Sequence, residues 1–360
     1  MNLNILVLPG DGIGTEVTRE AVRVLRHVAS KWNHTVNLTE GLLGGIAIHK
    51  CGNPLPPETE KLAADADATL MGAVGLPEFD NVAPDKRPER GLLGIRKLLG
   101  VYANLRPVRA YASQLDSSPL KNHLVEGTDM IIVRELTGGI YYGTPRGITE
   151  SGAEVRAVNT MTYTRSDIER VARMAFRLAT ARRKKVTSVD KSNVLENSQL
   201  WRRVVTEVAK EFPDVALDHL LVDNCAMQLI LNPRQFDVLL TENMFGDILS
   251  DEGAVLAGSI GMLPSASIGD QKASGAWVGL YEPVHGSAPD IAGQNKANPL
   301  GAIGSVAAML AYSFGLKQEA AAVEAAIETV LKSGKVTADL RPPGPPATTE
   351  QVGAAVCAAI

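Results

Sequence analysis

Short apolar runs that end in glycine-rich turns recur along the chain, and this pattern constrains the fold most. Residues 3–8 form the first run, which the turn of residues 9–14 breaks. Residues 68–71 form another, followed by the glycines of residues 72–75. Apolar residues at helical spacing follow the first turn. Strands that alternate with helices in this way predict an α/β fold.

The first turn resembles a dinucleotide-binding fingerprint but does not match it. Its glycines stand at positions 10, 12 and 14, and Thr15 occupies the place where the fingerprint requires glycine. A helix is predicted to begin at Thr15 or Glu16. We therefore predict an α/β fold that is not a Rossmann fold.

Composition narrows the class of protein. The 360 residues, of which 45% are hydrophobic and 21% charged, are enough for two domains. A net charge of −4 and only 4% aromatic residues argue against nucleic-acid binding. Three scattered cysteines (Cys51, Cys225, Cys357) form no C-x-x-C pair, so we expect reduced thiols.

Neither a membrane span nor a targeting segment is visible in the sequence. Apolar runs are too short to cross a bilayer, and residues 1–4 carry no basic residue. We expect a soluble, cytoplasmic protein without a membrane partner.

The run Phe245–Glu252 follows an apolar strand pattern, residues 236–241. If it is helical, Asp247 and Asp251 lie about one turn apart on one face. Two hard oxygen ligands suit Mg²⁺ or Mn²⁺. The alternative is an ordinary helix start, with Asp247 favoured by the helix dipole and Asp251 solvated.

A third carboxylate and three arginines are further candidates. Asp223 ends the apolar run of residues 220–222. Arg96, Arg106 and Arg134 would form a receptor for a dicarboxylate if they converge, because guanidinium binds carboxylate bidentately. The alternative is that each is a solvated surface arginine.

Several stretches, in this order, resemble the metal-dependent β-decarboxylating dehydrogenases. They are residues 8–14, 103–107, 133–141, 188–191, 243–251 and 282–293. The resemblance covers nearly the whole chain. It implies an isopropylmalate/isocitrate dehydrogenase-like two-domain fold with a large mixed sheet flanked by helices.

Under this resemblance, one discontinuous domain binds the cofactor and the other binds substrate and metal. Residues 1–103 and 262–360 would form the first domain, and residues 104–261 the second. Residues 143–163, which are rich in turns and short β-like runs, would form an arm that pairs with a second subunit. The implied partner is a second copy of the chain, in a homodimer with shared active sites.

The family oxidises the hydroxyl of a substituted malate with NAD⁺ and then releases the neighbouring carboxylate as CO₂. By position, Asp247 and Asp251 match the metal ligands that one subunit supplies. Asp223 matches the metal ligand that the other subunit supplies, and this residue also contacts substrate. Lys191 matches the base that takes the hydroxyl proton, which in the family also comes from the partner subunit. Tyr141 matches the acid that protonates the enol carbon. Without the resemblance, Lys191 would be a surface lysine and Tyr141 a half-buried strand aromatic.

The resemblance also implies where NAD binds. Asp290 would accept hydrogen bonds from the adenosine ribose, and its charge would repel a 2′-phosphate, which favours NAD over NADP. The remaining residues implied to contact the cofactor are Ile13, Glu89, Gly261, His285, Gly286, Ser287, Ala288, Pro289, Ile291 and Asn298.

Leu92, Leu93 and Val194 would line the pocket for the substituent on the malate. Apolar side chains leave a third carboxylate unpaired at a large desolvation cost. An isopropyl group is therefore the expected guest, with 4-methyl-2-oxopentanoate as product, as in leucine biosynthesis. Aryl-substituted malate, tartrate, homoisocitrate and a non-catalytic binding role remain alternatives.

Three positions depart from the family's usual residues. Leu76 and Glu242 stand where glycine is common, and Ser192 stands in an alanine position. None of them removes a proposed catalytic group, but they leave room for a larger apolar substituent or for reduced activity.

Overall fold

The computed structural model describes residues 1–83 and 86–360 and divides into two compact units. Unit 1 comprises Met1–Val101, Ala110–Glu126 and Ala254–Ile360, and unit 2 comprises Tyr102–Arg109 and Gly127–Gly253. Residues 110–126 and 254–261 thus fall in unit 1 and residues 102–103 in unit 2, whereas the resemblance implied the opposite domain for each. Residues 110–126 are held to unit 1 by contacts distant in sequence: the Ser117 hydroxyl donates to the Leu340 carbonyl, and the Gln114 amide to the Leu331 carbonyl.

Unit 1 contains a mixed sheet with the order β2-β1-β3-β12-β11, in which only the β11–β12 pair is antiparallel. Its strands are β1 (Asn2–Gly10), β2 (Thr35–Glu40), β3 (Ala68–Ala73), β11 (Pro264–Gln271) and β12 (Trp277–Pro283). Its helices are α1 (Gly14–Lys31), α2 (Gly45–Cys51), α3 (Pro57–Asp65), α4 (Pro88–Leu98), α5 (Asn122–Val125), α10 (Leu300–Tyr312), α11 (Lys317–Ser333) and α12 (Thr349–Ala359).

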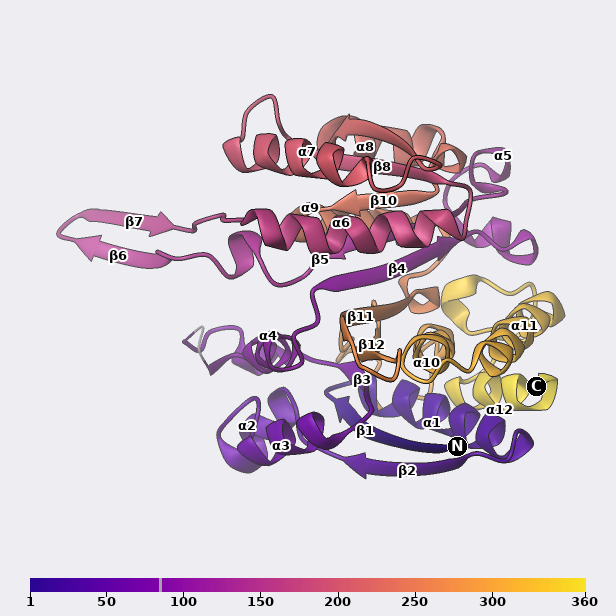
Figure 1. The fold of residues 1–360 in the computed structure, drawn as a ribbon. Helices are drawn as coiled ribbons and strands as arrows, with labels where there is room; N and C mark the ends of the chain where they lie inside the picture. The colour runs from indigo at the N-terminus through magenta and orange to yellow at the C-terminus, as the bar shows by residue number, and fades with distance from the viewer. Residues whose placement is uncertain (84–85) are drawn as a thin grey trace. The chain divides into compact units, whose positions relative to one another are not determined.

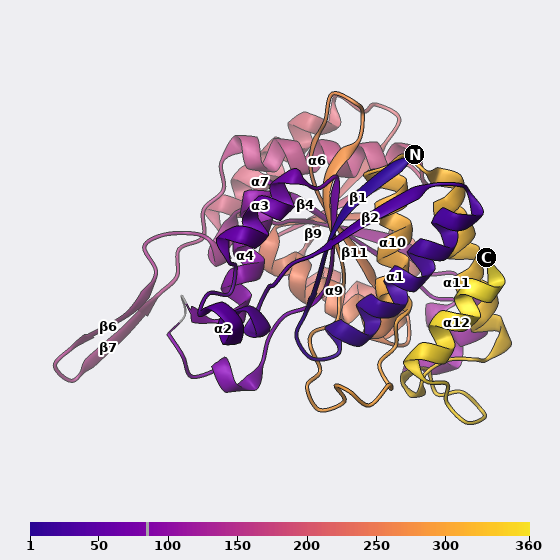
Figure 2. The ribbon, with the colours of Figure 1, turned by 90° about the horizontal axis from the view of Figure 1, so that it is seen from below.

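Helices pack against both faces of strands β1 and β3, which are buried along most of their length, whereas β2 is exposed or half-buried. Helices α1, α10, α11 and α12 lie together and contact one another (Figure 2). A separate core joins Leu6 and Leu8 of β1 to Leu43, Leu55 and Ile95, in or beside α2 to α4.

The ten-stranded mixed sheet has strands in both units, and those of unit 2 run in the order β4-β5-β10-β8-β9. Strands β5, β10, β8 and β9 are parallel, and β4 is antiparallel to β5. The strands of this unit are β4 (Ala103–Arg109), β5 (Asp129–Glu135), β6 (Gly147–Ser151), β7 (Glu154–Val158), β8 (Lys185–Asp190), β9 (Ala216–Leu221) and β10 (Val238–Thr241). The helices are α6 (Arg165–Thr180), α7 (Glu196–Ala209), α8 (Val222–Leu231) and α9 (Asn243–Leu256).

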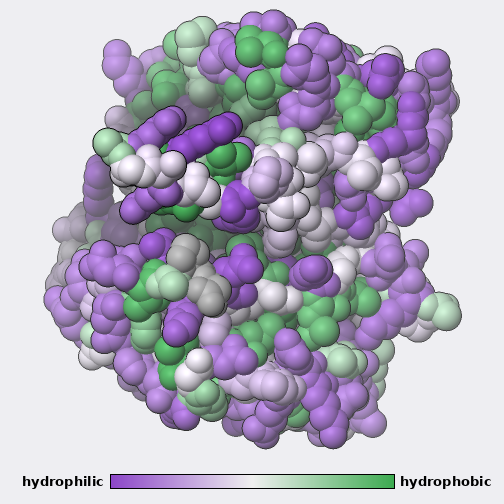
Figure 3. Space-filling view, turned by 90° about the vertical axis from the view of Figure 1, so that its left-hand side faces the viewer, coloured by the Kyte–Doolittle hydropathy of each residue, from purple (hydrophilic) through white to green (hydrophobic). Residues whose placement is uncertain are grey.

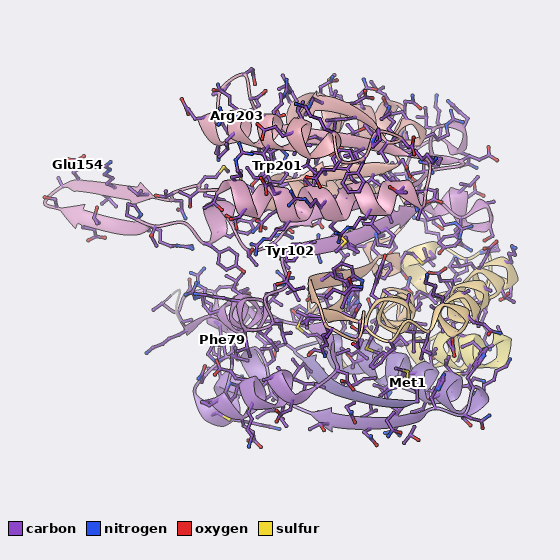
Figure 4. The ribbon with its side chains drawn as sticks, viewed as in Figure 1. Met1, Phe79, Tyr102, Glu154, Trp201 and Arg203 are labelled. Carbon is purple, nitrogen blue, oxygen red and sulfur yellow. The ribbon has the colours of Figure 1, made fainter. Side chains whose placement is uncertain are left out.

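A two-stranded hairpin, β6–β7, extends away from the rest of unit 2 (Figure 1). Glu154 lies at its far end, distant from Trp201 in α7 (Figure 4). Every residue of β6 is exposed, and those of β7 are exposed or half-buried. The predicted β-like arm is therefore present, and its pairing with a second subunit stays a prediction.

Apolar residues at helical spacing predict a helix over residues 200–212. In the structure this helix is α7, which begins at Glu196 and ends at Ala209, because its polar first turn carries no apolar residue that would mark it. The sequence also predicts Thr349 as the cap of the last helix, but Thr348 is the cap.

The described residues include no helix that is both long and apolar enough to cross a membrane. On the face drawn in Figure 3, hydrophilic and hydrophobic residues are intermixed.

Candidate active site

The candidate catalytic residues of unit 2 follow the carboxyl ends of its parallel strands. Arg134 is near the end of β5, Lys191 follows β8, Asp223 follows β9, and Asp247 follows β10. Because these strands are parallel, their carboxyl ends share one edge of the sheet, the usual place for ligands in α/β proteins.

Arg134 is buried and held on two sides. Its Nε and Nη2 atoms donate to the Asn243 side-chain oxygen at 2.9 and 2.7 Å, and its Nη1 atom donates to Asp247 Oδ1. Helix α9 comes close to the arginine because residue 246 is glycine: a Cβ there would lie 2.7 Å from the Arg134 Cγ atom. The guanidinium is therefore fixed in one orientation.

Arg106 lies on the same face of the sheet as Arg134. Asn104 is directly opposite Arg134, and Arg106 is two residues further along β4. The Arg106 guanidinium donates to Asn104 at 2.8 Å and to the Ser250 hydroxyl at 2.5 Å. Its Nη1 atom is 3.5 Å from Asp247 Oδ1. Two of the three predicted arginines thus converge on Asp247, and the idea that they are solvated surface residues is wrong, because both are buried.

Tyr141 joins this cluster through its hydroxyl, which donates to Asp247 Oδ2 at 3.0 Å. Burial and the Asp247 charge raise the pKa of Tyr141 to about 12. Its ring lies 5.7 Å from the Arg134 guanidinium. A phenol with such a pKa stays protonated at neutral pH and can donate a proton.

Asp247 and Asp251 both lie on α9, as predicted. Asp247 is the fifth residue of the helix, past its first turn, and pairs with Arg134, whereas Asp251 is exposed, as the alternative of an ordinary helix start expects. Burial and the neighbouring Asp247 raise the pKa of Asp251, although Arg106 and Arg134 oppose this. Two adjacent carboxylates fit a divalent cation chemically. In the described part of one chain, however, no three groups gather that could hold a metal.

Lys191 and Asp223 form a separate pair, with Nζ and Oδ1 2.5 Å apart. Its hydrogen bond to Lys191 lowers the pKa of Asp223. Asp223 shares a face of α8 with the exposed Met227, Ile230 and Leu231. The third predicted metal ligand thus lies on an exposed, largely apolar helix face.

Arg96 lies in unit 1, on α4, where it is buried and paired with Glu282 at 2.6 Å. Leu92 and Leu93 are half-buried on the same helix, and Val194 of unit 2 is 61% exposed. The shared role of these residues in substrate binding remains a prediction.

In unit 1, Asp11 organises the loops that follow β1 and β3. Its buried carboxylate accepts hydrogen bonds at 2.8 Å from the backbone N–H groups of Gly45, Ile46 and Gly75. The backbone N–H of Asp11 donates to the Ala73 carbonyl at 2.7 Å. The glycine-rich turns after both strands are therefore held together by one side chain.

The loop of residues 285–291 rests on the turn after β1. Ile13 N–H donates to the Ser287 carbonyl at 2.8 Å, and a Cβ at Gly12 would lie 3.0 Å from the Ser287 Cβ atom. Gly12 also has a φ of +54°. Only glycine allows this approach without strain.

The remaining predicted cofactor residues lie in unit 1, in or near these loops. His285 is buried, and burial lowers its pKa; its Nε2 atom has no partner. Asn298 is also buried, but it bonds Asp339 and the start of α10. Glu89 lies beside Gly75. The others are Gly261, which is buried, Gly286, Pro289 and Asp290, which are exposed, and Ala288 and Ile291, which are half-buried.

Sequence reasoning missed the residues that hold the arginines and loops in place. Asn104, Asn243 and Ser250 orient Arg106 and Arg134, and Asp11 orients the loops of unit 1. Each lies inside a motif used for the resemblance. Asp11 and Asn243 each follow the end of a buried strand, which was the available signal, whereas Asn104 within β4 and Ser250 within α9 had no such signal.

Comparisons with known proteins agree with the resemblance. Residues 4–356 match the family described as isocitrate/isopropylmalate dehydrogenase. A 3-isopropylmalate dehydrogenase of Geobacillus kaustophilus is 60% identical, over 95% of this chain and 91% of that protein. One from Priestia megaterium is 57% identical, over 94% and 91%.

Among solved structures, isocitrate dehydrogenase from Methylococcus capsulatus has a TM-score of 0.87 and 34% identity, with 99% of both chains covered. The predicted α/β fold with a large mixed sheet flanked by helices is confirmed. Because the matches span nearly the whole sequence, this chain belongs to the isocitrate/isopropylmalate dehydrogenase family.

Proposed function

We propose that the protein oxidises and decarboxylates 3-isopropylmalate with NAD⁺, giving 4-methyl-2-oxopentanoate, CO₂ and NADH. The observation that supports this most is the cluster in unit 2, where Arg106, Arg134 and Tyr141 all meet Asp247. The cluster combines guanidinium groups that can bind a substrate carboxylate, carboxylate oxygens that can bind a metal, and a protonated phenol that can donate a proton.

The side chains divide the chemistry among them. Arg106 and Arg134 bind the substrate carboxylates, because buried guanidinium groups form strong, directional hydrogen bonds. Lys191 removes the hydroxyl proton, and Tyr141 returns a proton to carbon after CO₂ leaves. When bound, NAD⁺ would accept the hydride and a divalent cation would stabilise negative charge on the substrate oxygen.

The loops of unit 1 support NAD binding. Gly12 allows close backbone approach, and the buried His285 Nε2 atom lacks a partner that a nucleotide could supply. Asp290 is exposed and available to ribose hydroxyls. Asp247 and Asp251 offer hard oxygen ligands that suit Mg²⁺ or Mn²⁺.

We propose a homodimer whose active sites are shared. Asp223 lies on a face of α8 with exposed apolar residues, and Asp251 lies near the exposed Ile248 on α9. Exposed apolar patches mark interaction sites. If these faces pack against a second copy, Asp223 of the partner subunit completes the carboxylate set.

The substrate is proposed from two observations. Relatives at 60% and 57% identity are named 3-isopropylmalate dehydrogenase. Leu92 and Leu93 place apolar side chains on α4, beside Arg96. A third carboxylate, as in isocitrate, would lose its hydration there without compensation.

The test is turnover by the purified protein with NAD⁺ and Mn²⁺, following NADH. We expect 3-isopropylmalate to give the highest kcat/KM in a panel with isocitrate, tartrate, homoisocitrate and an aryl-substituted malate. Mg²⁺ and a metal-free chelated sample complete the series. A higher kcat/KM for another acid would identify that acid as the substrate instead. No turnover of any acid would refute the proposed activity.

Shared sites are tested by mixing two inactive variants. Lys191→Ala and Asp247→Asn each lose turnover alone. In each hybrid dimer, one of the two sites has both Lys191 and Asp247 intact. Random exchange makes half of the dimers hybrids, so activity should return to about a quarter of that of the original protein. With subunit exchange shown by mass spectrometry, absence of recovery would contradict the sharing of sites.

A further inference from the structure

The first turn of α9 is held by side chains that the proposed chemistry does not use. The first N–H groups of a helix have no partner inside the helix. Here Asn243 N–H donates to the Tyr163 hydroxyl at 3.0 Å. Met244 N–H and Phe245 N–H donate to the Glu242 carboxylate at 3.1 and 2.6 Å. All three N–H groups are thus satisfied by Tyr163 and Glu242.

These two side chains also bond each other. The Tyr163 hydroxyl donates to Glu242 Oε2 at 3.0 Å. Glu242 is buried, and burial raises its pKa. The glutamate that departs from the family's usual glycine is therefore not a loose charge ahead of the helix. Glu242 takes the cap position, just before the first turn of the helix, where proteins in general favour a short Ser, Thr, Asp or Asn.

Through Asn243, this helix start reaches the substrate-binding arginine. The Asn243 side-chain oxygen accepts two of the hydrogen bonds that orient Arg134, and its nitrogen donates to the carbonyls of Leu136 and Gly138. A shift of the first turn would move the Asn243 oxygen. Arg134 would then lose two of its hydrogen bonds.

Tyr163 also supports the segment that carries Tyr141. Its ring lies against Gly138 and Gly139, where an added Cβ would be 2.7 and 2.9 Å from ring atoms. Gly139 N–H donates to the Thr162 carbonyl at 3.0 Å. The ring also packs edge-on against Trp201, with centroids 5.7 Å apart. Tyr163 therefore contacts two segments: the start of α9, which carries Asp247, and residues 138–139, which precede Tyr141.

We infer that Glu242 and Tyr163 act as one pair of positioning residues, which fixes Arg134 and Tyr141 relative to Asp247 without contacting substrate. This inference rests on the proposed function for its kinetic consequence. Its structural consequence, a fixed Arg134 guanidinium, does not depend on that function.

The experiment compares Tyr163→Phe, Glu242→Gln and the double variant. Tyr163→Phe keeps the ring against Gly138 and removes only the hydroxyl. We expect each single variant to raise the KM for 3-isopropylmalate about tenfold, because part of a charge-assisted contact is lost. The double variant should be little worse than either single one, as expected for two groups that act as one. The dissociation constant for NAD⁺ should not change.

Thr164→Ala is the matched control. Thr164 is the next residue along and caps α6 through a capping box with Asp167, so its loss loosens the same segment but leaves the Tyr163 hydroxyl. We expect an unchanged KM. An equal rise in KM would mean general loosening and would overturn the inference.

A second readout keeps the inference separate from the proposed function. In the original protein, the Arg134 Nε–H resonance, assigned through its loss in Arg134→Lys, should exchange slowly with water. It should broaden or vanish in Tyr163→Phe and Glu242→Gln but not in Thr164→Ala. Unchanged resonances would refute the positioning role even if turnover is found. Changed resonances without any turnover would support it while refuting the proposed function.

Discussion

Asp11 illustrates how a single buried carboxylate can organise a binding region. Its two oxygens accept three backbone N–H groups, from Gly45, Ile46 and Gly75, and so connect the start of α2 to the turn after β3. A carboxylate in a buried site needs such compensation, because hydrogen bonds to charged groups offset the cost of losing water.

We predict that Asp11→Asn lowers the free energy of unfolding by about 2–3 kcal/mol, because an amide nitrogen replaces one acceptor and faces backbone N–H groups. Urea unfolding followed by circular dichroism measures the change. Asp65→Asn, at an exposed position on α3, is the control and should leave stability unchanged. Equal stabilities of the two variants would show that the three hydrogen bonds contribute nothing.

His285 gives stability a pH dependence. Burial lowers its pKa below the usual value of about 6.5, so the unfolded chain binds the proton at a higher pH than the folded one. As pH falls below about 6.5, the unfolded state gains protons first and stability decreases. Above that pH both states are neutral and the effect disappears.

We therefore expect His285→Gln to reduce the loss of stability on acidification, by up to about 1.4 kcal/mol per pH unit below 6.5. Chemical unfolding at a series of pH values compares this variant with His27→Gln, which changes an exposed histidine of α1. The prediction fails if both variants keep the slope of the original protein.

At the scale of elements, two helices begin with a threonine whose side chain caps the first turn. Helix α6 has a capping box of Thr164 and Asp167, and α12 has one of Thr348 and Gln351. Thr349, the residue that the sequence favoured, instead donates its hydroxyl to the Ala297 carbonyl at 2.6 Å. Both threonines suit a cap, and only the backbone conformation of Thr348, extended just before the first turn, decides between them.

Thr348→Ala should lower the free energy of unfolding by about 1 kcal/mol, because the Gln351 N–H loses its acceptor. Thr348→Ser, which keeps the hydroxyl, should restore nearly all of it. Thermal and urea unfolding of the three proteins measure this. If the serine variant were as unstable as the alanine variant, the lost stability would come from the methyl group and not from the cap.

At the scale of the molecule, the exposed apolar face of α8 is the strongest indication of assembly. Met227 is 57% exposed, and Ile230 and Leu231 lie beside it on the same face as Asp223. In a homodimer this face would be buried, and the removal of apolar surface from water would stabilise the pair.

Met227→Glu is expected to shift the protein from dimer to monomer and to lower turnover, because Asp223 would no longer reach a second subunit. Analytical ultracentrifugation measures the change in mass. Leu98→Glu places the same charge at another exposed leucine, 45% exposed on α4, and should remain dimeric. A Met227→Glu dimer with full activity would place the interface elsewhere.

The sequence alone determined the alternation of strands with helices, the exclusion of a Rossmann fold and the location of the acidic helix. Periodicity and glycine-rich turns are local properties, so they can be read without knowing which strands pair. Asp247 and Asp251 share a helix for the same reason. Their spacing along the chain already fixes their positions on an α-helix.

Only the tertiary structure decided which distant residues meet. Residues 110–126 belong with unit 1 because Ser117 bonds Leu340, and Glu242 is a buried helix cap because Tyr163 reaches it from the segment after β7. Arg106 and Arg134 converge on Asp247 because three strands lie in register. These contacts join residues far apart in the chain, and their free energy depends on burial and partners that no local pattern specifies.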